Sequence, residues 1–138
     1  MRVGTVPTSA VRHSSKRKSK YNSKKVYVDG LKFDSTLEYN FYKKYLLLQK
    51  AGEITDIVLQ PKYELIPTIK WTNFKGEKVT ESKISYIADF LLTFKDGHKE
   101  IVDVKGVKTP VYNIKRRLLL HKLQGSNIVF KEVTRREL

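Results

Sequence analysis

Two consecutive apolar segments, each interrupted by one acidic residue, constrain the fold of this chain most strongly. They are "ISYIADFLLTF" (residues 84–94) and "HKEIVDVKG" (residues 98–106), and a Lys-Asp-Gly connection joins them. A short polar connection that contains glycine, placed between two apolar runs, predicts a β-hairpin. Asp89 interrupts the first run and Asp103 the second. The register of the hairpin decides whether these two carboxylates meet.

Two registers are open for this hairpin. A two-residue turn pairs Asp89 with Val104 and sends Asp103 to the other face. A three-residue loop, with Gly97 in the left-handed conformation, sets Asp89 opposite Asp103. The second register also gathers the aliphatic and aromatic side chains on one face. We favour it, and we expect Asp89, Asp103 and Lys105 to share the opposite face.

Two carboxylates placed this close repel each other unless a cation lies between them. Lys105 is one such cation, and a structural Asp–Lys pair is one interpretation of the pattern. A divalent metal is the other, because Mg²⁺ takes carboxylate oxygens as ligands. A third carboxylate, Glu38, lies in the first turn of a predicted helix. Ser35 and Glu38 have the spacing of a capping box, so Glu38 either satisfies a backbone N–H or reaches the aspartate pair.

The charge of the chain predicts a polyanionic partner. Twenty-eight lysines and arginines stand against fourteen acidic residues, a net charge of +14 over 138 residues. Such an excess favours nucleic acid as the partner. The absence of cysteine excludes disulfides and thiolate metal sites. Without a long apolar run or an apolar N-terminal stretch, we expect a cytoplasmic protein with no membrane partner.

The first 25 residues form a separate compositional block. They are basic and serine-rich, with no acidic residue before Asp29, which predicts a flexible arm followed by a single domain over residues 26–138. A solvated tail is the alternative. The residues that we expect on nucleic acid are Lys16, Arg17, Lys18, Lys20, Lys24 and Lys25 of the arm and Lys108, Lys115, Arg116 and Lys122 of a later helix.

The remaining pattern predicts an α/β (α+β) fold with a mixed sheet. We expect a helix from Ser35 to Gly52 and a second helix with Thr109 as its N-cap and Pro110 in its first turn. Further strands are predicted at 54–66, with an edge or bulge at its proline, and at 127–133. A last strand reached through a helix is expected to be parallel to its neighbour. A small Asp-Gly hairpin precedes the first helix, and residues 67–83 predict a long loop or an extra hairpin.

Glu38, Asp89 and then Asp103-Val104-Lys105 resemble, in this order, the signature of the PD-(D/E)XK nucleases, with Ala88 where the name places proline. The segments "KKVYVDGLKFDSTLEYNFY", "AGEITDIVLQPKYEL", "YIADF" and "DVKGVKTPVYNIKRRLL" resemble a family of small phage-encoded nucleases. These are described as Holliday-junction-resolvase-like recombination endonucleases. The resemblance covers residues 24–133.

The resemblance implies a restriction-endonuclease-like core of order α-β-β-β-α-β and a metal-dependent endonuclease. Asp89, Asp103 and the backbone carbonyl of Val104 would bind Mg²⁺, with Mn²⁺ as a substitute. Glu38 would complete this shell or hold a second metal, and Lys105 would orient or deprotonate the attacking water.

The expected substrate is branched DNA, such as Holliday junctions in phage recombination, inside an infected bacterial cell. A homodimer would supply the two symmetric cuts that a junction needs. A structure-tolerant nicking DNase and a non-catalytic nucleic-acid-binding module are the alternatives.

Overall fold

The computed structural model describes residues 25–138, so all but the last of the 25 arm residues lie outside the described part. The chain divides into two compact units, one ending at Thr36 and the other spanning Leu37–Leu138. In the first unit, β1 (Val26–Val28) and β2 (Leu31–Phe33) form the predicted antiparallel hairpin. Asp29 and Gly30 form its turn with φ of 50° and 78°, as a tight two-residue hairpin turn requires.

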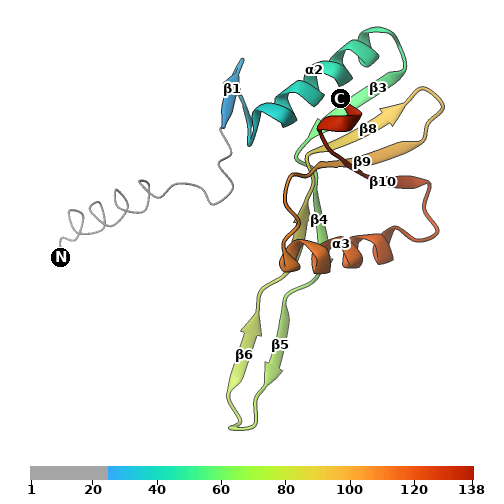
Figure 1. Cartoon of the computed structure of the whole chain (residues 1–138). Helices are drawn as coiled ribbons and strands as arrows, with labels where there is room; N and C mark the ends of the chain where they lie inside the picture. The colour runs from blue at the N-terminus through green and yellow to red at the C-terminus, as the bar shows by residue number, and fades with distance from the viewer. Residues whose placement is uncertain (1–24) are drawn as a thin grey trace, which may run out of the picture. The chain divides into compact units, whose positions relative to one another are not determined.

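The second unit contains a four-stranded sheet in the order β10-β9-β8-β3 (Figure 1). β9 is antiparallel to β8, which is antiparallel to β3, whereas β10 runs parallel to β9. The mixed sheet with a parallel last strand is therefore confirmed, as is the α+β class. The strands are β3 (Ile54–Leu59), β8 (Phe90–Phe94), β9 (Lys99–Val104) and β10 (Ile128–Val133).

The helices α2 (Thr36–Lys50) and α3 (Pro110–Leu123) have the ends that the sequence predicts. After α2, Gly52 has φ of 86°, and the N–H groups of the last turn bond back to helix carbonyls, which is a glycine C-cap. The Thr109 side chain accepts a hydrogen bond of 3.1 Å from the backbone N–H of Tyr112, and Pro110 follows at the first helical position. None of the helices in residues 25–138 is long and apolar enough to cross a membrane.

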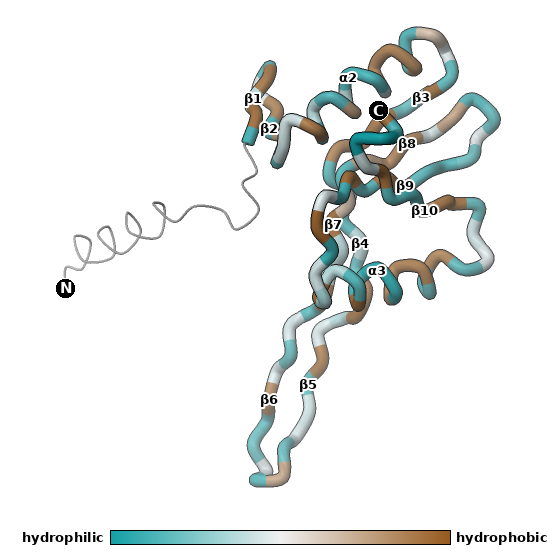
Figure 2. The backbone as a smooth tube through the Cα atoms, viewed as in Figure 1, coloured by the Kyte–Doolittle hydropathy of each residue, from teal (hydrophilic) through white to brown (hydrophobic). Residues whose placement is uncertain are grey.

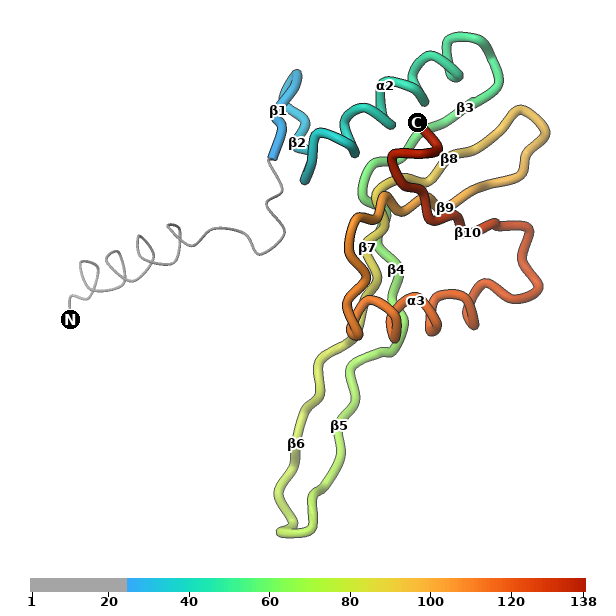
Figure 3. Tube along the Cα trace, in the orientation of Figure 1, coloured from blue at the N-terminus to red at the C-terminus, as the bar shows by residue number. Residues whose placement is uncertain are grey.

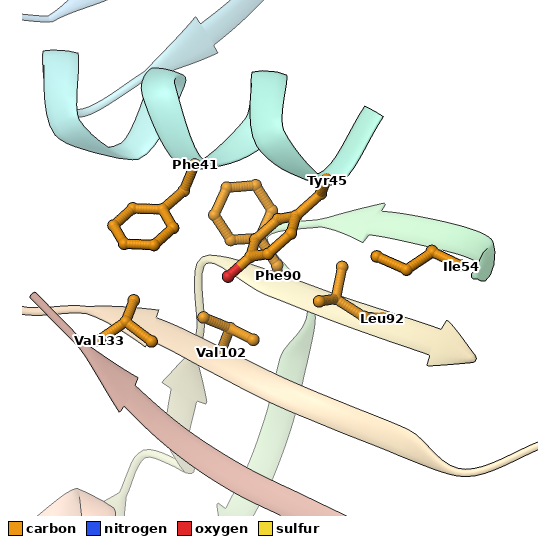
Figure 4. Packing of buried hydrophobic residues seen from close by; sticks show 7 residues of the cluster. All are labelled: Phe41, Tyr45, Ile54, Phe90, Leu92, Val102 and Val133. Carbon is orange, nitrogen blue, oxygen red and sulfur yellow. The ribbon is translucent and has the colours of Figure 1, made fainter. Parts of the chain in front are cut away.

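Helix α2 packs on one face of the sheet through an aromatic cluster. Phe90 is fully buried, and its ring meets Tyr45 edge to face with 5.1 Å between centroids. Phe41 completes the helix side of this cluster, and Val102 lies below it on β9 (Figure 4). Side chains alternate along a strand, so the neighbouring Ile101 belongs to a second cluster, with Leu119 of α3. The sheet thus lies between two apolar layers.

The predicted single strands over 54–66 and 84–94 are wrong, because each is divided in two. The outer pieces, β4 (Lys62–Ile66) and β7 (Ile84–Ile87), form a sheet of their own. Two backbone hydrogen bonds of 3.0 Å lie where β4 and β7 separate from β3 and β8. The N–H of Gln60 donates to the carbonyl of Asp89, and the N–H of Ala88 donates to the carbonyl of Pro61. Gln60 has φ of 51°, and proline lacks an N–H, so both chains bend here together.

Residues 67–83 form the extra hairpin rather than the long loop. Its strands are β5 (Ile69–Thr72) and β6 (Lys78–Glu81), which pair with each other. The trace in Figure 3 shows this ribbon continuing the direction of β4 and β7. It is mostly hydrophilic or intermediate in colour, with a few short hydrophobic stretches (Figure 2). The chain ends in the short 3₁₀ helix η1 (Arg135–Glu137).

Candidate active site

The β8–β9 hairpin has the three-residue register that the sequence favours. Phe90 pairs with Val102, and one further step along the same register sets Asp89 opposite Asp103. Gly97 has φ of 93°, and its N–H bonds to the carbonyl at the end of β8. The left-handed glycine closes the loop without the strain that a side chain would add. The hairpin therefore brings the two aspartates together.

Asp89 lies where β8 begins, half-buried and among negative charges. Its Oδ2 accepts a hydrogen bond of 2.7 Å from the backbone N–H of Val104. Burial, then the charge of Glu38 and then the charge of Asp103 raise the pKa of Asp89 to about 9, against the lowering effect of the Val104 N–H. Burial and the neighbouring negative charges therefore favour the protonated form of the Asp89 carboxyl.

Glu38 extends from the first turn of α2 and is only 4% exposed. The charge of Glu38 raises the pKa of Asp89, so the two carboxyl groups lie close enough to interact electrostatically. The structure thus brings Glu38 to the aspartates, as the sequence allowed. The buried charge of Glu38 acts on Asp89, and this placement favours a role for Glu38 at the site.

Asp103 is 2% exposed and binds two partners from different elements. Lys105 Nζ lies 3.2 Å from its Oδ1. The hydroxyl of Tyr86, on β7, donates a hydrogen bond to its Oδ2. The pKa of Tyr86 is raised by burial and by this bond, so the phenol stays protonated. Tyr86 could not be recognised from the sequence, because a tyrosine in an apolar run gives no signal until the strands are placed.

Lys105 is held from a second side by helix α3. Its Nζ lies 4.2 Å from the centre of the Tyr112 ring, a cation–π contact. The Tyr112 hydroxyl donates a 2.5 Å hydrogen bond to Glu132, which also binds Arg116 at 2.8 Å and Lys108 at 3.4 Å. The tyrosine is a second site residue that the sequence did not reveal. Arg116 and Lys108, expected on nucleic acid, are thus paired with a carboxylate beside the site.

An open pocket of about 290 Å³ lies between β7, β9 and the start of α3. Asp103 and Lys105 line one side of it, and Thr109 and Lys115 line another. The N-terminal N–H groups of a helix and two lysines favour an anion such as a phosphate group. Lys115 is thus the predicted basic residue that the structure places at the pocket itself.

The other predicted basic residues lie elsewhere. Lys122 Nζ donates to the backbone carbonyl of Glu64 at 3.0 Å, so it contacts β4. Lys25 is exposed. The backbone N–H of Gln60 donates a hydrogen bond to the backbone carbonyl of Asp89. The arm residues Lys16, Arg17, Lys18, Lys20 and Lys24 lie outside the described residues.

The donor atoms at the site suit a hard cation. Among residues 25–138, no group of three or more histidine, cysteine, aspartate or glutamate side chains is arranged so that it could hold a metal ion. Asp89 and Asp103 nonetheless offer the oxygen ligands that Mg²⁺ prefers, and Mg²⁺ usually keeps several waters beside one or two carboxylates. Burial raises the pKa of Asp89 most, and the charges of Glu38 and Asp103 raise it further; a bound cation would offset the effect of these charges. The carboxylates of Asp89 and Asp103 therefore suit Mg²⁺ as ligands, and Glu38 is not one of these two.

Comparison with known proteins gave one relationship. Neither the curated proteins nor the solved structures compared with the chain gave a match. A family model described as "Protein of unknown function (DUF1064)" matches residues 18–136, which include β1, both aspartates and all of η1 except its last residue. Since the match covers most of the sequence, the chain belongs to the DUF1064 family.

Proposed function

We propose that this protein is a metal-dependent endonuclease that hydrolyses DNA phosphodiesters, preferentially in branched DNA. The observation that carries the proposal is the meeting of Asp89, Asp103 and Lys105, with an ion pair of 3.2 Å between the last two. Glu38 adds a further buried carboxylate beside them. The order of these residues and the resemblance to the PD-(D/E)XK signature support the same chemistry.

Each residue has a chemical task in this proposal. Asp89, Asp103 and the backbone carbonyl of Val104 would hold Mg²⁺ or Mn²⁺, and Glu38 would bind waters of the metal or a second ion. The bound metal supplies Lewis acidity and an activated water. Lys105 Nζ orients the water and neutralises negative charge on the phosphate. In the hydrolysis, a water oxygen forms a new bond to phosphorus, one ester P–O bond breaks, and the leaving oxygen takes a proton.

The basic residues around the site support a DNA substrate. Lys115 and the start of α3 line the pocket beside Asp103, where a phosphate group can be bound. The net charge of +14 supplies attraction over a longer range. We extend the proposal to a homodimer acting on four-way junctions, because two symmetric sites make the paired cuts that such a junction needs.

A non-catalytic nucleic-acid-binding module is the second candidate, and the charge of the chain favours it equally. A binding module does not account for the buried carboxylates, since the negative charges of Glu38 and Asp103 oppose phosphate binding. A nicking DNase without junction preference has the same site and differs in the DNA shape that it accepts.

The test compares cleavage of a labelled four-way junction and a linear duplex in Mg²⁺, in Mn²⁺ and in EDTA. We expect paired cuts at the junction with either metal and none in EDTA. Asp103→Asn should abolish cleavage, whereas Asp56→Asn, an exposed position on β3, should preserve it. Cutting of both substrates would replace the resolvase by a general DNase. Tight binding without cutting would favour the binding module.

A further inference from the structure

The β5–β6 ribbon has a surface that the site does not use. Among the described strands, β5 and β6 pair only with each other (Figure 1). Every residue of the two strands is exposed except the half-buried Val79. An isolated two-stranded hairpin buries little apolar surface of its own. The ribbon therefore presents both of its faces to a partner.

The register separates the two faces by charge. Lys70 pairs with Thr80 and Thr72 with Lys78, so these four side chains share one face. Cations and hydroxyls of this kind contact phosphate oxygens in protein–DNA complexes. The other face has Ile69, Trp71, Val79 and Glu81. One face is thus basic and the other apolar with an acidic residue.

The acidic residues of the ribbon are held away from the basic face. Glu81 accepts a hydrogen bond of 3.1 Å from the indole N–H of Trp71, and Glu77 accepts one of 3.0 Å from the side-chain amide of Asn73. Among the ion pairs of residues 25–138, none involves Lys70 or Lys78. Their charges are therefore available to an anion.

The tip of the ribbon presents an aromatic ring in a fixed turn. Asn73 Oδ1 accepts hydrogen bonds from the N–H groups of Lys75 at 2.9 Å and Glu77 at 3.0 Å. Gly76 has φ of 80°, which closes the turn. Phe74 is 95% exposed, with Lys75 Nζ 5.8 Å from its ring centre. An exposed ring beside a cation is suited to stack on a base.

We propose that the β5–β6 ribbon binds DNA through this geometry. Lys70 and Lys78 contact phosphate groups, and Phe74 stacks on a base that is unpaired or exposed at a branch. A two-stranded ribbon is narrow enough to enter a major groove, and apolar side chains are used as wedges between bases. The inference rests on the proposed function for its substrate, DNA, but it does not require cleavage.

The test is the binding of fluorescently labelled four-way junction and duplex in EDTA, measured by anisotropy over a range of salt concentrations. The double variant Lys70→Gln/Lys78→Gln is compared with Lys50→Gln/Lys99→Gln, which removes two exposed lysines of α2 and β9 that form no ion pair with another described residue. We expect the ribbon variant to bind about tenfold more weakly, with a salt slope shallower by about 2, since each phosphate contact contributes about 0.9. Phe74→Ala should weaken junction binding about fivefold or more and leave duplex binding within twofold.

Three results would overturn the inference: no binding by the unsubstituted protein, equal losses in the two double variants, or equal effects of Phe74→Ala on both DNAs.

The two proposals can fail separately. If the protein cuts DNA with Mg²⁺ but the ribbon variants bind normally, the ribbon inference is wrong and the nuclease stands. If nothing is cut but the ribbon variants bind more weakly in EDTA, the nuclease is wrong and the ribbon inference stands. Because the substituted lysines and Phe74 are exposed, circular dichroism of each variant should match that of the unsubstituted protein.

Discussion

The backbone N–H of Val104 donates a hydrogen bond of 2.7 Å to Oδ2 of Asp89. This bond connects the start of β8 to the end of β9. Its donor, Val104, lies between Asp103 and Lys105 in the sequence. This N–H donor favours the charged form of Asp89 and so opposes the rise of its pKa that burial and the charges of Glu38 and Asp103 cause. The position of Asp89 therefore depends on the backbone of its neighbour strand as well as on its own.

Asp89→Asn should remove a pH dependence of folding stability. Asp89 has a folded pKa of about 9 and an ordinary value of 3.8, so between these values the folded state holds a proton that the unfolded state has released. Stability is therefore lost as pH rises from about 4 to about 9, by at most about 1.4 kcal/mol per pH unit. Asparagine has no such proton and should flatten the profile. Urea unfolding in EDTA at several pH values measures this.

The exposed substitution Asp56→Asn is the control for this experiment, and it should retain the slope of the unsubstituted protein. Equal slopes for Asp89→Asn and Asp56→Asn would show that the Asp89 carboxyl is already ionised at neutral pH. Asparagine can still accept the hydrogen bond from Val104, so the strand ends should stay joined.

Magnesium should stabilise the protein, and more strongly at pH 8 than at pH 6. A metal ligand must be deprotonated and the pKa of Asp89 is raised, so protons compete with the metal for this carboxyl. At a concentration 100 times its Kd, a ligand specific for the folded state stabilises it by about 2.7 kcal/mol. Thermal unfolding with Mg²⁺ or EDTA should show this rise in Tm. Asp103→Asn should lose it, whereas Asp56→Asn should keep it; an equal Mg²⁺ effect in both would contradict a site at Asp103.

The register that joins the two aspartates could be predicted because the apolar side chains on the two strands agree. With a three-residue loop, Phe90, Leu92 and Val102 share one face, and the structure buries them together under α2. A one-residue slip would have sent half of these side chains to the other face. Local sequence therefore contained enough information to place Asp89 opposite Asp103.

The bend before Asp89 could not be predicted in the same way. The apolar run from Ile84 to Phe94 looks continuous, and Ala88 is not a residue that breaks strands. The chain bends there because Ala88 is bonded to Pro61 in a partner strand that itself turns at Gln60. This is a property of the paired strands, which are far apart in the sequence. For the same reason Tyr86 was missed, although it contacts Asp103.

Tyr86→Phe should destabilise the fold by about 1–3 kcal/mol, because a buried acceptor on Asp103 loses its donor. The ring of Tyr86 packs against Phe130 and stays in place, so the loss reports the hydroxyl. Tyr27→Phe removes a hydroxyl from a side chain that is 70% exposed and should change stability by less than about 0.5 kcal/mol. Denaturant unfolding gives both values. Similar values for the two variants would mean that the Tyr86 bond adds nothing.

Phe90→Ala should cost about 3–5 kcal/mol, because its fully buried ring fills the space between α2 and the sheet. Phe74→Ala removes the same side chain from the exposed tip of the ribbon and should cost less than about 0.5 kcal/mol. The pair therefore compares one chemical change at two degrees of burial. Calorimetric unfolding measures it, and a small loss for Phe90→Ala would show that the cluster can collapse around the missing ring.

Glu132→Gln should strengthen DNA binding while weakening the fold only slightly. Glu132 pairs with Arg116 and Lys108, and its loss of charge leaves both cations free to contact phosphate. The amide oxygen can still accept the hydrogen bond from Tyr112, so the ring beneath Lys105 should stay in place. We expect an affinity gain of several-fold at low salt that shrinks as salt screens the charges. Because these pairs are partly exposed, the loss of stability should stay below about 1 kcal/mol.

Glu53→Gln is the matched control for this prediction, since it breaks an exposed ion pair with Lys95 and adds the same charge at the far end of β3. General attraction between a more basic protein and DNA would raise the affinity of both variants equally. A gain confined to Glu132→Gln would place the DNA backbone beside Arg116 and Lys108. An equal gain in the two variants would instead show that DNA is attracted by net charge, and these two cations would lose their assignment.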